Sequence, residues 1–470
     1  MAQKHPLAHS RQNRFPHVFC ICLVVLFSLG VTSPFSLPHS QAALVQLAWD
    51  SSPPEQNVVG YKVYYGTATK SYDRKVDVGL STTCVIGELL QGTTYYFAVT
   101  ACTSVSESGY SDEISFLAPR NWTQFRYGAT HQGFNPYENT LSPSNVAGLN
   151  EAWSYLTGGI IFSSPAVINS IVYAGSLDNK LYALDAGTGA LKWSYTTGNI
   201  ISSSPAVASG VVYVGSNEGK LYALKANYGA FKWSYNTLGG ISSSPAVASG
   251  VVYVGSSDGK LYALDAGTGA LKWSYTTGNI ISSSPAVAGG VVYVGSSDGK
   301  VYALDAGTGT LKWSYTTGNG IDYSSPAVAG GVVYVGSNDG KLYALRTATG
   351  TLKWSYPIGG PLVYSSPAVA NGVVYVGSND GKVYALDAGT GAFKWSYATG
   401  GPLVYSSPAV ANGVVYVGSN DGKLYALDAT SGACLWSAFT GSEIGSSPAI
   451  VNGKVYIGSK AGGLHAYSIH

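Results

Sequence analysis

The stretch SSPAVASGVVYVGSSDGKLYALDAGTGALKWSYTTG, at residues 243–278, recurs with small changes through most of this 470-residue chain. One tryptophan marks each copy, and successive tryptophans lie 40 residues apart up to Trp313 and 41 residues apart after it. The eight are Trp153, Trp193, Trp233, Trp273, Trp313, Trp354, Trp395 and Trp436. A fixed period of about 40 residues, with several short strands in each period, predicts a propeller or solenoid rather than separate domains.

Each copy divides into four strands joined by tight turns. In residues 243–278, SPAVA begins the first strand, VVYVG and KLYALD follow as the second and third, and LKWSYT is the fourth. The SDG and GTG steps between them are typical turn sequences. The second and third strands are apolar at most positions, so both faces of each sheet must be covered, as they are when sheets stack around an axis. We therefore predict an all-β fold, an eight-bladed β-propeller of four-stranded blades.

The first and last copies predict how the ring closes. A tryptophan strand at residues 151–155 precedes the first SPAV unit, and the last unit ends at residue 470 without such a strand. We predict that residues 151–155 complete the final blade, beside strands at 455–459 and 464–468. A closed ring leaves no long open strand edge, which would otherwise invite aggregation. The propeller is predicted to span residues 119–470.

The third and fourth strands carry the pattern A-x-D-x-x-T-G-x-x-x-W, present for example as Ala263, Asp265, Thr268, Gly269 and Trp273. This pattern resembles the tryptophan-docking repeat of pyrroloquinoline quinone (PQQ) dehydrogenases and of the BamB envelope proteins. The entry sequence from Asn145 to Trp153 also resembles the segment that opens quinoprotein propellers. The resemblance covers about residues 121–470, and it implies that the eight tryptophans dock between blades.

Catalytic function transfers less readily than fold. The resemblance to quinoproteins implies adjacent cysteines, a calcium ion and a catalytic aspartate, yet the predicted propeller contains one cysteine, Cys434. Its aspartates mostly stand in turns such as Asp258-Gly259, where a hairpin role is expected. After residue 42 the only histidines are His131, His465 and His470, which offer no obvious metal site or Ser/His/Asp triad. We predict no catalytic residues, metal or cofactor, and a PQQ- and calcium-dependent dehydrogenase stays an alternative.

Residues 1–42 are predicted to be a secretory signal. Lys4, Arg11 and Arg14 precede an apolar run at residues 18–31, and small residues follow at Ser40 and Ala42. The protein is then exported, to the periplasm, the cell surface or the medium. The alternative is an uncleaved anchor, the only case in which membrane contact is expected.

Residues 44–118 do not share the repeat and are predicted to form a small β-sandwich. Trp49, the strand GYKVYYG with Tyr61, and the run LLQGTTY ending at Tyr95 resemble a fibronectin type III domain. Such modules usually act as spacers or binding units. A disulfide between Cys84 and Cys102 is left open, because the sequence does not establish their proximity.

Charge excludes one class of partner. Without residues 1–42 the chain has 23 basic residues, 26 minus three, against 24 acidic ones. The lysines recur about once per repeat and form no basic patch, so we predict no nucleic-acid partner. We expect a monomer.

Function is expected where the copies differ. The loop from tryptophan to the next proline is one residue longer in three consecutive copies, and each of these places a tyrosine three residues before the proline: Tyr323, Tyr364 and Tyr405. With Asp322, they are predicted to form a stacking surface for a glycan, a peptide or a protein strand. The alternative is that the tyrosines only fill space. The leading prediction is a non-catalytic exported binding or scaffolding protein, with a quinoprotein dehydrogenase and a BamB-like envelope assembly factor as alternatives.

Overall fold

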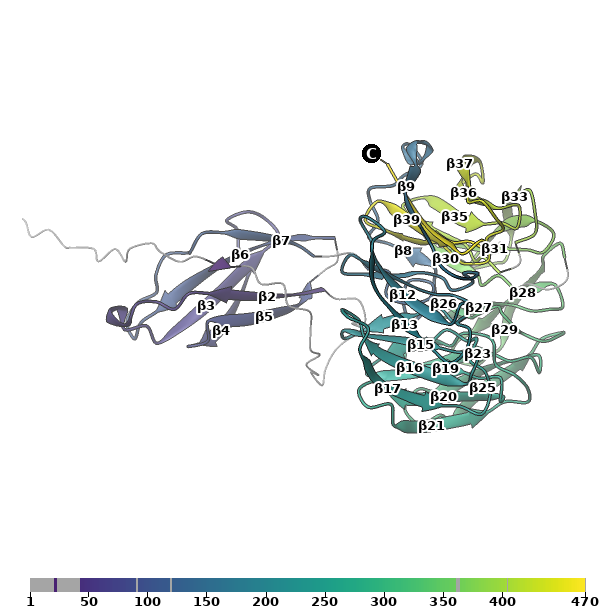
Figure 1. The fold of residues 1–470 in the computed structure, drawn as a ribbon, viewed down its shortest axis with the longest axis horizontal. Helices are drawn as coiled ribbons and strands as arrows, with labels where there is room; N and C mark the ends of the chain where they lie inside the picture. The colour runs from purple at the N-terminus through teal and green to yellow at the C-terminus, as the bar shows by residue number, and fades with distance from the viewer. Residues whose placement is uncertain are drawn as a thin grey trace, which may run out of the picture. The chain divides into compact units, whose positions relative to one another are not determined.

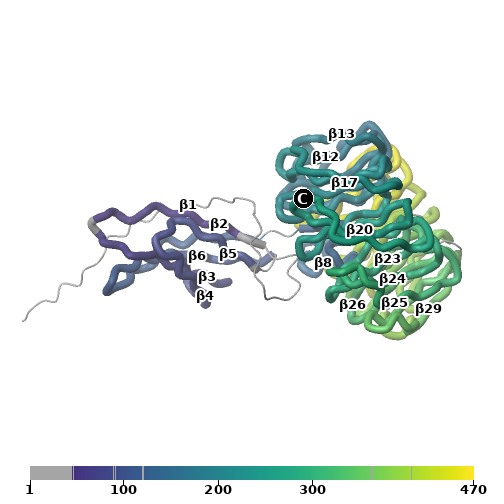
Figure 2. Tube along the Cα trace, turned by 90° about the horizontal axis from the view of Figure 1, so that it is seen from below, coloured from purple at the N-terminus to yellow at the C-terminus, as the bar shows by residue number. Residues whose placement is uncertain are grey.

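The computed structural model describes residues 21–22, 43–89, 92–118, 121–360, 364–403 and 405–469. These residues form two compact units, which meet in sequence between residues 118 and 121. Both units consist of β-strands (Figures 1 and 2). The described part of the chain has two short 3-10 helices, and no helix in it is long and apolar enough to span a membrane. The all-β prediction is confirmed.

The first unit is a sandwich of two antiparallel sheets, in the orders β1-β2-β5 and β4-β3-β6-β7. Its elements are β1 (Ile21–Cys22), β2 (Ala43–Trp49), η1 (Pro54–Gln56), β3 (Gly60–Gly66), β4 (Arg74–Gly79), β5 (Thr83–Leu89), β6 (Thr94–Cys102) and β7 (Ile114–Leu117). Alternate residues of the strands fill the core, where Trp49 meets Tyr61 edge to face with ring centroids 5.8 Å apart. Cys84 and Cys102 lie on different sheets as free thiols, so the disulfide left open by the sequence is not formed. The predicted signal, residues 1–42, lies outside the described residues except for Ile21–Cys22.

The second unit opens with β8 (Phe134–Asn135), η2 (Val146–Gly148) and β9 (Asn150–Leu156), and then repeats four-stranded blades. Blades one to four are β10 (Ala166–Ile168), β11 (Ile171–Gly175), β12 (Lys180–Asp185), β13 (Leu191–Thr196); β14 (Ala206–Ala208), β15 (Val211–Gly215), β16 (Lys220–Lys225), β17 (Phe231–Asn236); β18 (Ala246–Ala248), β19 (Val251–Gly255), β20 (Lys260–Asp265), β21 (Leu271–Thr276); and β22 (Ala286–Ala288), β23 (Val291–Gly295), β24 (Lys300–Asp305), β25 (Leu311–Thr316).

Blades five to seven are β26 (Ala327–Ala329), β27 (Val332–Gly336), β28 (Lys341–Arg346), β29 (Leu352–Pro357); β30 (Ala368–Ala370), β31 (Val373–Gly377), β32 (Lys382–Asp387), β33 (Phe393–Ala398); and β34 (Ala409–Ala411), β35 (Val414–Gly418), β36 (Lys423–Asp428), β37 (Cys434–Phe439). The last three strands are β38 (Ala449–Val451), β39 (Lys454–Gly458) and β40 (Gly463–Ser468). Each blade is an antiparallel sheet, and β8 adds a parallel strand to the seventh. Successive blades lie side by side (Figure 2).

The eighth blade combines the two ends of the second unit. β9 pairs antiparallel with β40, with Trp153 opposite Ala466, and gives the sheet order β38-β39-β40-β9. In Figure 1 the blue β9 lies beside the yellow C-terminal strands. The fourth strand of the last blade therefore comes from the start of the repeat region.

The tryptophans of the fourth strands join neighbouring blades. The indole Nε1 of Trp153 donates to the Ala186 carbonyl at 3.1 Å, and that of Trp193 to the Ala226 carbonyl at 2.9 Å. Trp436 donates instead to the Leu149 carbonyl at 3.0 Å, because the eighth blade has chain ends where the other blades have a turn. A Cβ on Gly189 would stand 2.7 Å from the Trp153 ring, so this turn needs glycine both for its φ of +75° and for the indole that covers it.

Candidate functional site

The loops that lead into blades five, six and seven bring the three predicted tyrosines together at one end of the propeller. The rings of Tyr364 and Tyr405 are stacked, with centroids 5.8 Å apart and planes 6° from parallel. Tyr323 meets both edge to face, at 5.2 Å from Tyr364 and 5.6 Å from Tyr405. Tyr323 is 44% exposed and Tyr405 36% exposed, so the cluster presents aromatic surface to solvent. We call this cluster, with Phe162, the aromatic mouth.

Phe162 extends the cluster although it was not predicted as a site residue. Its ring lies edge to face with Tyr405 at 5.5 Å, and the Lys460 ammonium lies 5.8 Å from its centroid. The space for it comes from Gly445, where a Cβ would stand 2.6 Å from the Phe162 ring. Phe162 occupies the position in its loop that the tyrosines occupy in theirs, and that correspondence was the signal in the sequence.

Charged groups flank the aromatic mouth. Asp322 directly precedes Tyr323 in the chain. It accepts hydrogen bonds from the Ser297 hydroxyl and the Asn338 amide, each at 2.5 Å, and these bonds fix the position of its carboxylate. Lys460 pairs with Glu443 at the other side of the cluster, next to Phe162. Burial raises the pKa of Tyr323 and of Tyr364, and the Asp322 charge adds to the increase for both, so these phenols are neutral at physiological pH. The mouth can therefore offer ring faces, hydroxyl donors and a carboxylate.

The opposite arc of the mouth carries small side chains. Ser202, Ser242 and Ser282 stand at the corresponding loop positions and are partly exposed. Serine leaves room where tyrosine would cover the end of the axis. One arc of the mouth thus carries aromatic side chains and the other carries small hydroxyl side chains.

The described side chains do not fit a PQQ and calcium site. They contain no group of three or more His, Cys, Asp or Glu placed to hold a metal ion. The hairpin carboxylates have partners in their own turns: Asp258 accepts from the Lys260 amide at 2.9 Å and from the Tyr262 hydroxyl at 2.6 Å. Cys434 lies exposed on β37, the outer strand of its blade, and no second cysteine is adjacent to it.

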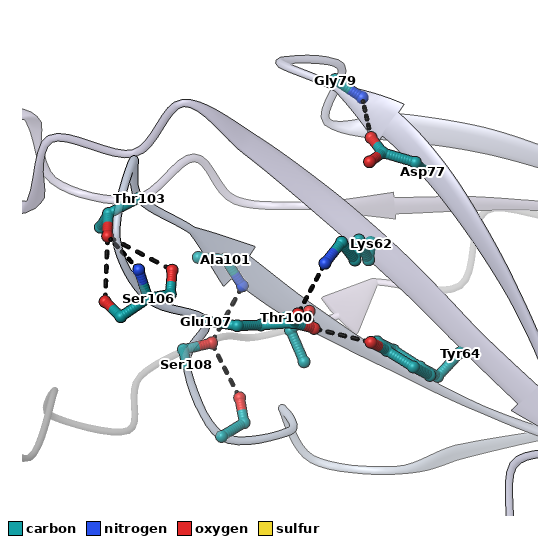
Figure 3. Close-up of polar contacts among 11 residues, drawn as sticks. Lys62, Tyr64, Asp77, Gly79, Thr100, Ala101, Thr103, Ser106, Glu107 and Ser108 are labelled. Atoms are coloured by element: carbon teal, nitrogen blue, oxygen red, sulfur yellow. Dashed lines mark hydrogen bonds and ion pairs between the residues drawn. The ribbon is translucent and has the colours of Figure 1, made fainter.

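The sandwich unit carries a separate polar cluster around Glu107 (Figure 3). The Glu107 carboxylate accepts hydrogen bonds from Lys62 Nζ at 2.6 Å, the Tyr64 hydroxyl at 2.7 Å and the Thr100 hydroxyl at 2.6 Å. These partners lie on β3 and β6, so the cluster ties the loop after β6 to the sheet. Burial raises the pKa of Glu107, but the hydrogen bonds outweigh it and lower the pKa to about 2.

Acid should weaken the sandwich unit through this cluster. Because the pKa of Glu107 in the folded unit is below its usual 4.5, the stabilisation is present above pH 4.5 and is lost as the pH falls toward 2. We expect the guanidinium midpoint of this unit to fall between pH 5 and pH 2.5, and to fall less in Glu107→Gln, which cannot gain the proton. Equal acid sensitivity in the two proteins would contradict this role.

Comparison with known proteins identifies the two units. A family model described as outer membrane protein assembly factor BamB matches residues 144–241, 237–365 and 359–470, and a fibronectin type III model matches residues 35–116. No curated protein matches the chain. The predicted resemblance to BamB and quinoprotein repeats, with a fibronectin type III unit before them, is confirmed.

Solved structures share the propeller fold at low identity. A europium-containing methanol dehydrogenase is 18% identical with a TM-score of 0.66, over 74% of this chain and 98% of its own. BamB from Moraxella catarrhalis is 23% identical with a TM-score of 0.60, over 68% and 97%. The computationally designed Ika8 protein is 21% identical with a TM-score of 0.62, over 68% and 99%. Because the family model covers residues 144–470 in overlapping segments, more than half of the chain, this protein belongs to the family of the outer membrane protein assembly factor BamB.

Proposed function

We propose that this protein is an exported, non-catalytic binding or scaffolding protein whose aromatic mouth contacts a glycan, a peptide or a protein strand. The observation that carries the proposal is the mutual packing of Tyr323, Tyr364 and Tyr405 at an exposed end of the ring. Rings held in fixed positions by their neighbours lose little conformational freedom when a ligand stacks on them. Export is supported by the basic and apolar sequence of residues 1–42.

A filling role would bury the tyrosines, whereas Tyr323 and Tyr405 keep more than a third of their surface exposed. The surface combines apolar ring faces with hydroxyls and with Asp322, which suits ligands that have both apolar faces and hydrogen-bond donors. Sugars and extended peptides share that chemistry.

The triple variant Tyr323→Ser, Tyr364→Ser, Tyr405→Ser tests the proposal. We expect screening on glycan and peptide arrays to identify ligands of the full chain, and the triple variant to bind them at least tenfold more weakly, since each lost ring contact contributes about 0.5–1.5 kcal/mol beyond its buried area. Tyr228→Ser is the matched control, because Tyr228 is 61% exposed on the turn between β16 and β17. Unchanged binding in the triple variant would reject the aromatic mouth as the site.

A second candidate, an envelope assembly factor, is favoured by the family match to BamB. It predicts stable protein partners in the cell envelope. Affinity purification of the tagged full chain from the envelope and from the culture medium separates the two functions. An assembly factor should be recovered together with envelope proteins, and the triple tyrosine variant should still be recovered with them.

A quinoprotein dehydrogenase is the third candidate, favoured by the fold shared with the methanol dehydrogenase. It is tested by adding PQQ and calcium and following absorbance and redox cycling with alcohol substrates. We expect no activity, since the chain lacks adjacent cysteines and the turn aspartates have partners in their own hairpins.

A further inference from the structure

The innermost strands of the eight blades are joined by a closed ring of serines. The Ser164 amide donates to the Ser204 hydroxyl at 2.9 Å, and the same bond repeats from blade to blade until the Ser447 amide donates to the Ser164 hydroxyl at 2.9 Å. The members of this serine ring are Ser164, Ser204, Ser244, Ser284, Ser325, Ser366, Ser407 and Ser447. Each ring hydroxyl thus satisfies a backbone amide at the start of the neighbouring inner strand.

Each ring hydroxyl accepts a hydrogen bond, and none of the eight donates one to another described residue. A serine hydroxyl has one proton to donate. Eight such donors around one axis therefore lack an acceptor within the described protein. A ligand that accepts hydrogen bonds would satisfy them.

The ring is buried throughout, and it is more deeply buried on its tyrosine arc than on its serine arc. Ser204 and Ser244 are 4% and 5% exposed, whereas Ser366 and Ser407, below the tyrosines, are each 1% exposed. The difference follows the aromatic mouth, because Tyr364 and Tyr405 lie two residues before Ser366 and Ser407.

A buried cation lies just beyond the ring. Arg126 comes from residues 121–135, which we call the axial segment, and is 2% exposed. Its Nη2 donates to the Pro367 carbonyl at 2.6 Å and its Nε to the His131 carbonyl at 3.2 Å. Pro367 directly follows the ring residue Ser366, so the guanidinium is hydrogen-bonded to the residue next to the serine ring.

Arg126 forms no ion pair with a described carboxylate, and its Nη1 has no hydrogen-bond partner there. Both ring nitrogens of His131 also lack one. Burial, and then the Arg126 charge, lower the pKa of His131 to about 3, so the imidazole is neutral and Arg126 is the charge to be balanced. An unpaired charge in a protein interior is strongly unfavourable unless an opposite charge compensates it.

Backbone strain marks the same segment. Arg126, Tyr127 and His131 have φ values of +58°, +83° and +53°, which are uncommon for residues with side chains. Such conformations persist where the surrounding structure imposes them, and they often accompany function. The positive φ values thus occur at residues whose side chains are buried beside the inner strands.

We infer that the axis of the propeller holds a compact anion, bound by hydroxyls of the serine ring and balanced by the charge of Arg126. A cation is disfavoured at this place, because the ring oxygens already accept amide protons and the nearest described charge is positive. The anion is a halide or the carboxylate of a larger molecule, since both are accepted by hydroxyl donors. This site is distinct from the aromatic mouth, and its existence does not depend on the function proposed above.

Crystals of the full chain soaked in sodium bromide test the site directly. We expect an anomalous peak on the axis within hydrogen-bond distance of the serine-ring hydroxyls. Bromide found only at the surface, or no peak at all, would rule out a halide, and the inference would then be overturned unless acetate stabilises the protein in solution. This measurement needs no variant and so does not depend on the folding of a mutant.

Solution measurements separate the two kinds of anion. Sodium bromide or sodium acetate replaces sodium isethionate at constant ionic strength while the melting temperature is followed. We expect saturable stabilisation by at least one of the two anions, and the anion that stabilises shows whether the site takes a halide or a carboxylate. The apparent affinity for it should be at least tenfold weaker in Arg126→Gln. Lys272→Gln, on the outer strand β21, is the matched control and should respond as the parent does. A melting temperature that ignores both anions, or that responds equally in Arg126→Gln, would contradict the site.

Discussion

Replacing β9 with a glycine–serine linker of the same length should lower the melting temperature of the propeller by about 10 °C or more. The linker keeps the chain connected but removes the fourth strand of the eighth blade, its ladder with β40 and the buried Trp153 indole. Loss of a buried tryptophan alone costs about 3–5 kcal/mol, and about 2–4 °C accompanies each kcal/mol in a domain of 150–250 residues. Thermal unfolding followed by circular dichroism measures the change.

The same replacement of β21 is the matched control. β21 is also a fourth strand with a buried tryptophan, Trp273, but its chain neighbours keep its blade joined to the next one. Either replacement exposes the edge of a third strand, β40 or β20, to pairing with other molecules, but only the β9 replacement also removes the pairing that closes the ring. We expect the β9 variant to melt lower than the β21 variant and to aggregate at lower protein concentration. Equal losses would show that β9 contributes only local packing.

The blades could be predicted because every copy of the repeat has the same pattern of four strands and their turns. The apolar residues of VVYVG and KLYALD required two covered faces, and the structure has eight stacked sheets with those strands at their centres. The equivalence of the three tyrosines could also be predicted from the sequence, since an extra loop residue in three consecutive copies places Tyr323, Tyr364 and Tyr405 at corresponding positions. Their mutual contact follows from the ring, which brings equivalent positions to one end.

Contacts that depend on ring closure, and segments outside the repeat, were not predictable in the same way. Phe162 reaches Tyr405 across the eighth blade because Gly445 leaves space, and that distance depends on ring closure rather than on local sequence. The axial segment has no copy to be compared with, and its path depends on positive φ at Arg126, Tyr127 and His131. Side chains with low propensity for that conformation give no local signal of such a path.

Removing the axial segment should have the second large effect. A chain that begins at residue 136 is expected to aggregate or to melt far below one that begins at residue 120, which lacks only the sandwich unit. In the intact protein the axial segment accepts hydrogen bonds from the inner strands of seven blades, at 2.7–2.9 Å. The donors are the amides of Val167, Val207, Val247, Val287, Val328, Val369 and Val410.

The eighth blade is engaged by a side chain, since Asn135 Nδ2 donates to the Ile450 carbonyl at 2.8 Å. The segment therefore contacts the inner edge of every blade. Leaving a buried amide without an acceptor costs about 1–3 kcal/mol, so the loss of even part of this set rivals the whole stability of a typical domain, about 5–15 kcal/mol. Water entering the axis would satisfy some amides and reduce the loss.

The variant Gly133→Ala tests the contacts between the axial segment and the inner strands by adding a single Cβ atom. Gly133 has a φ of +61°, and an added Cβ would stand 2.4 Å from Arg126 Nη2 and 3.1 Å from the Pro408 carbonyl oxygen. We expect a clear fall in melting temperature, because both the backbone conformation and the packing against the inner strands are disturbed. Gly250→Ala is the control: its φ is also positive, at +75°, but an added Cβ would meet no atom within 4 Å. If both alanine variants lose the same amount, backbone conformation alone explains the loss, and the axial segment is not the clamp that its hydrogen bonds to all eight blades indicate.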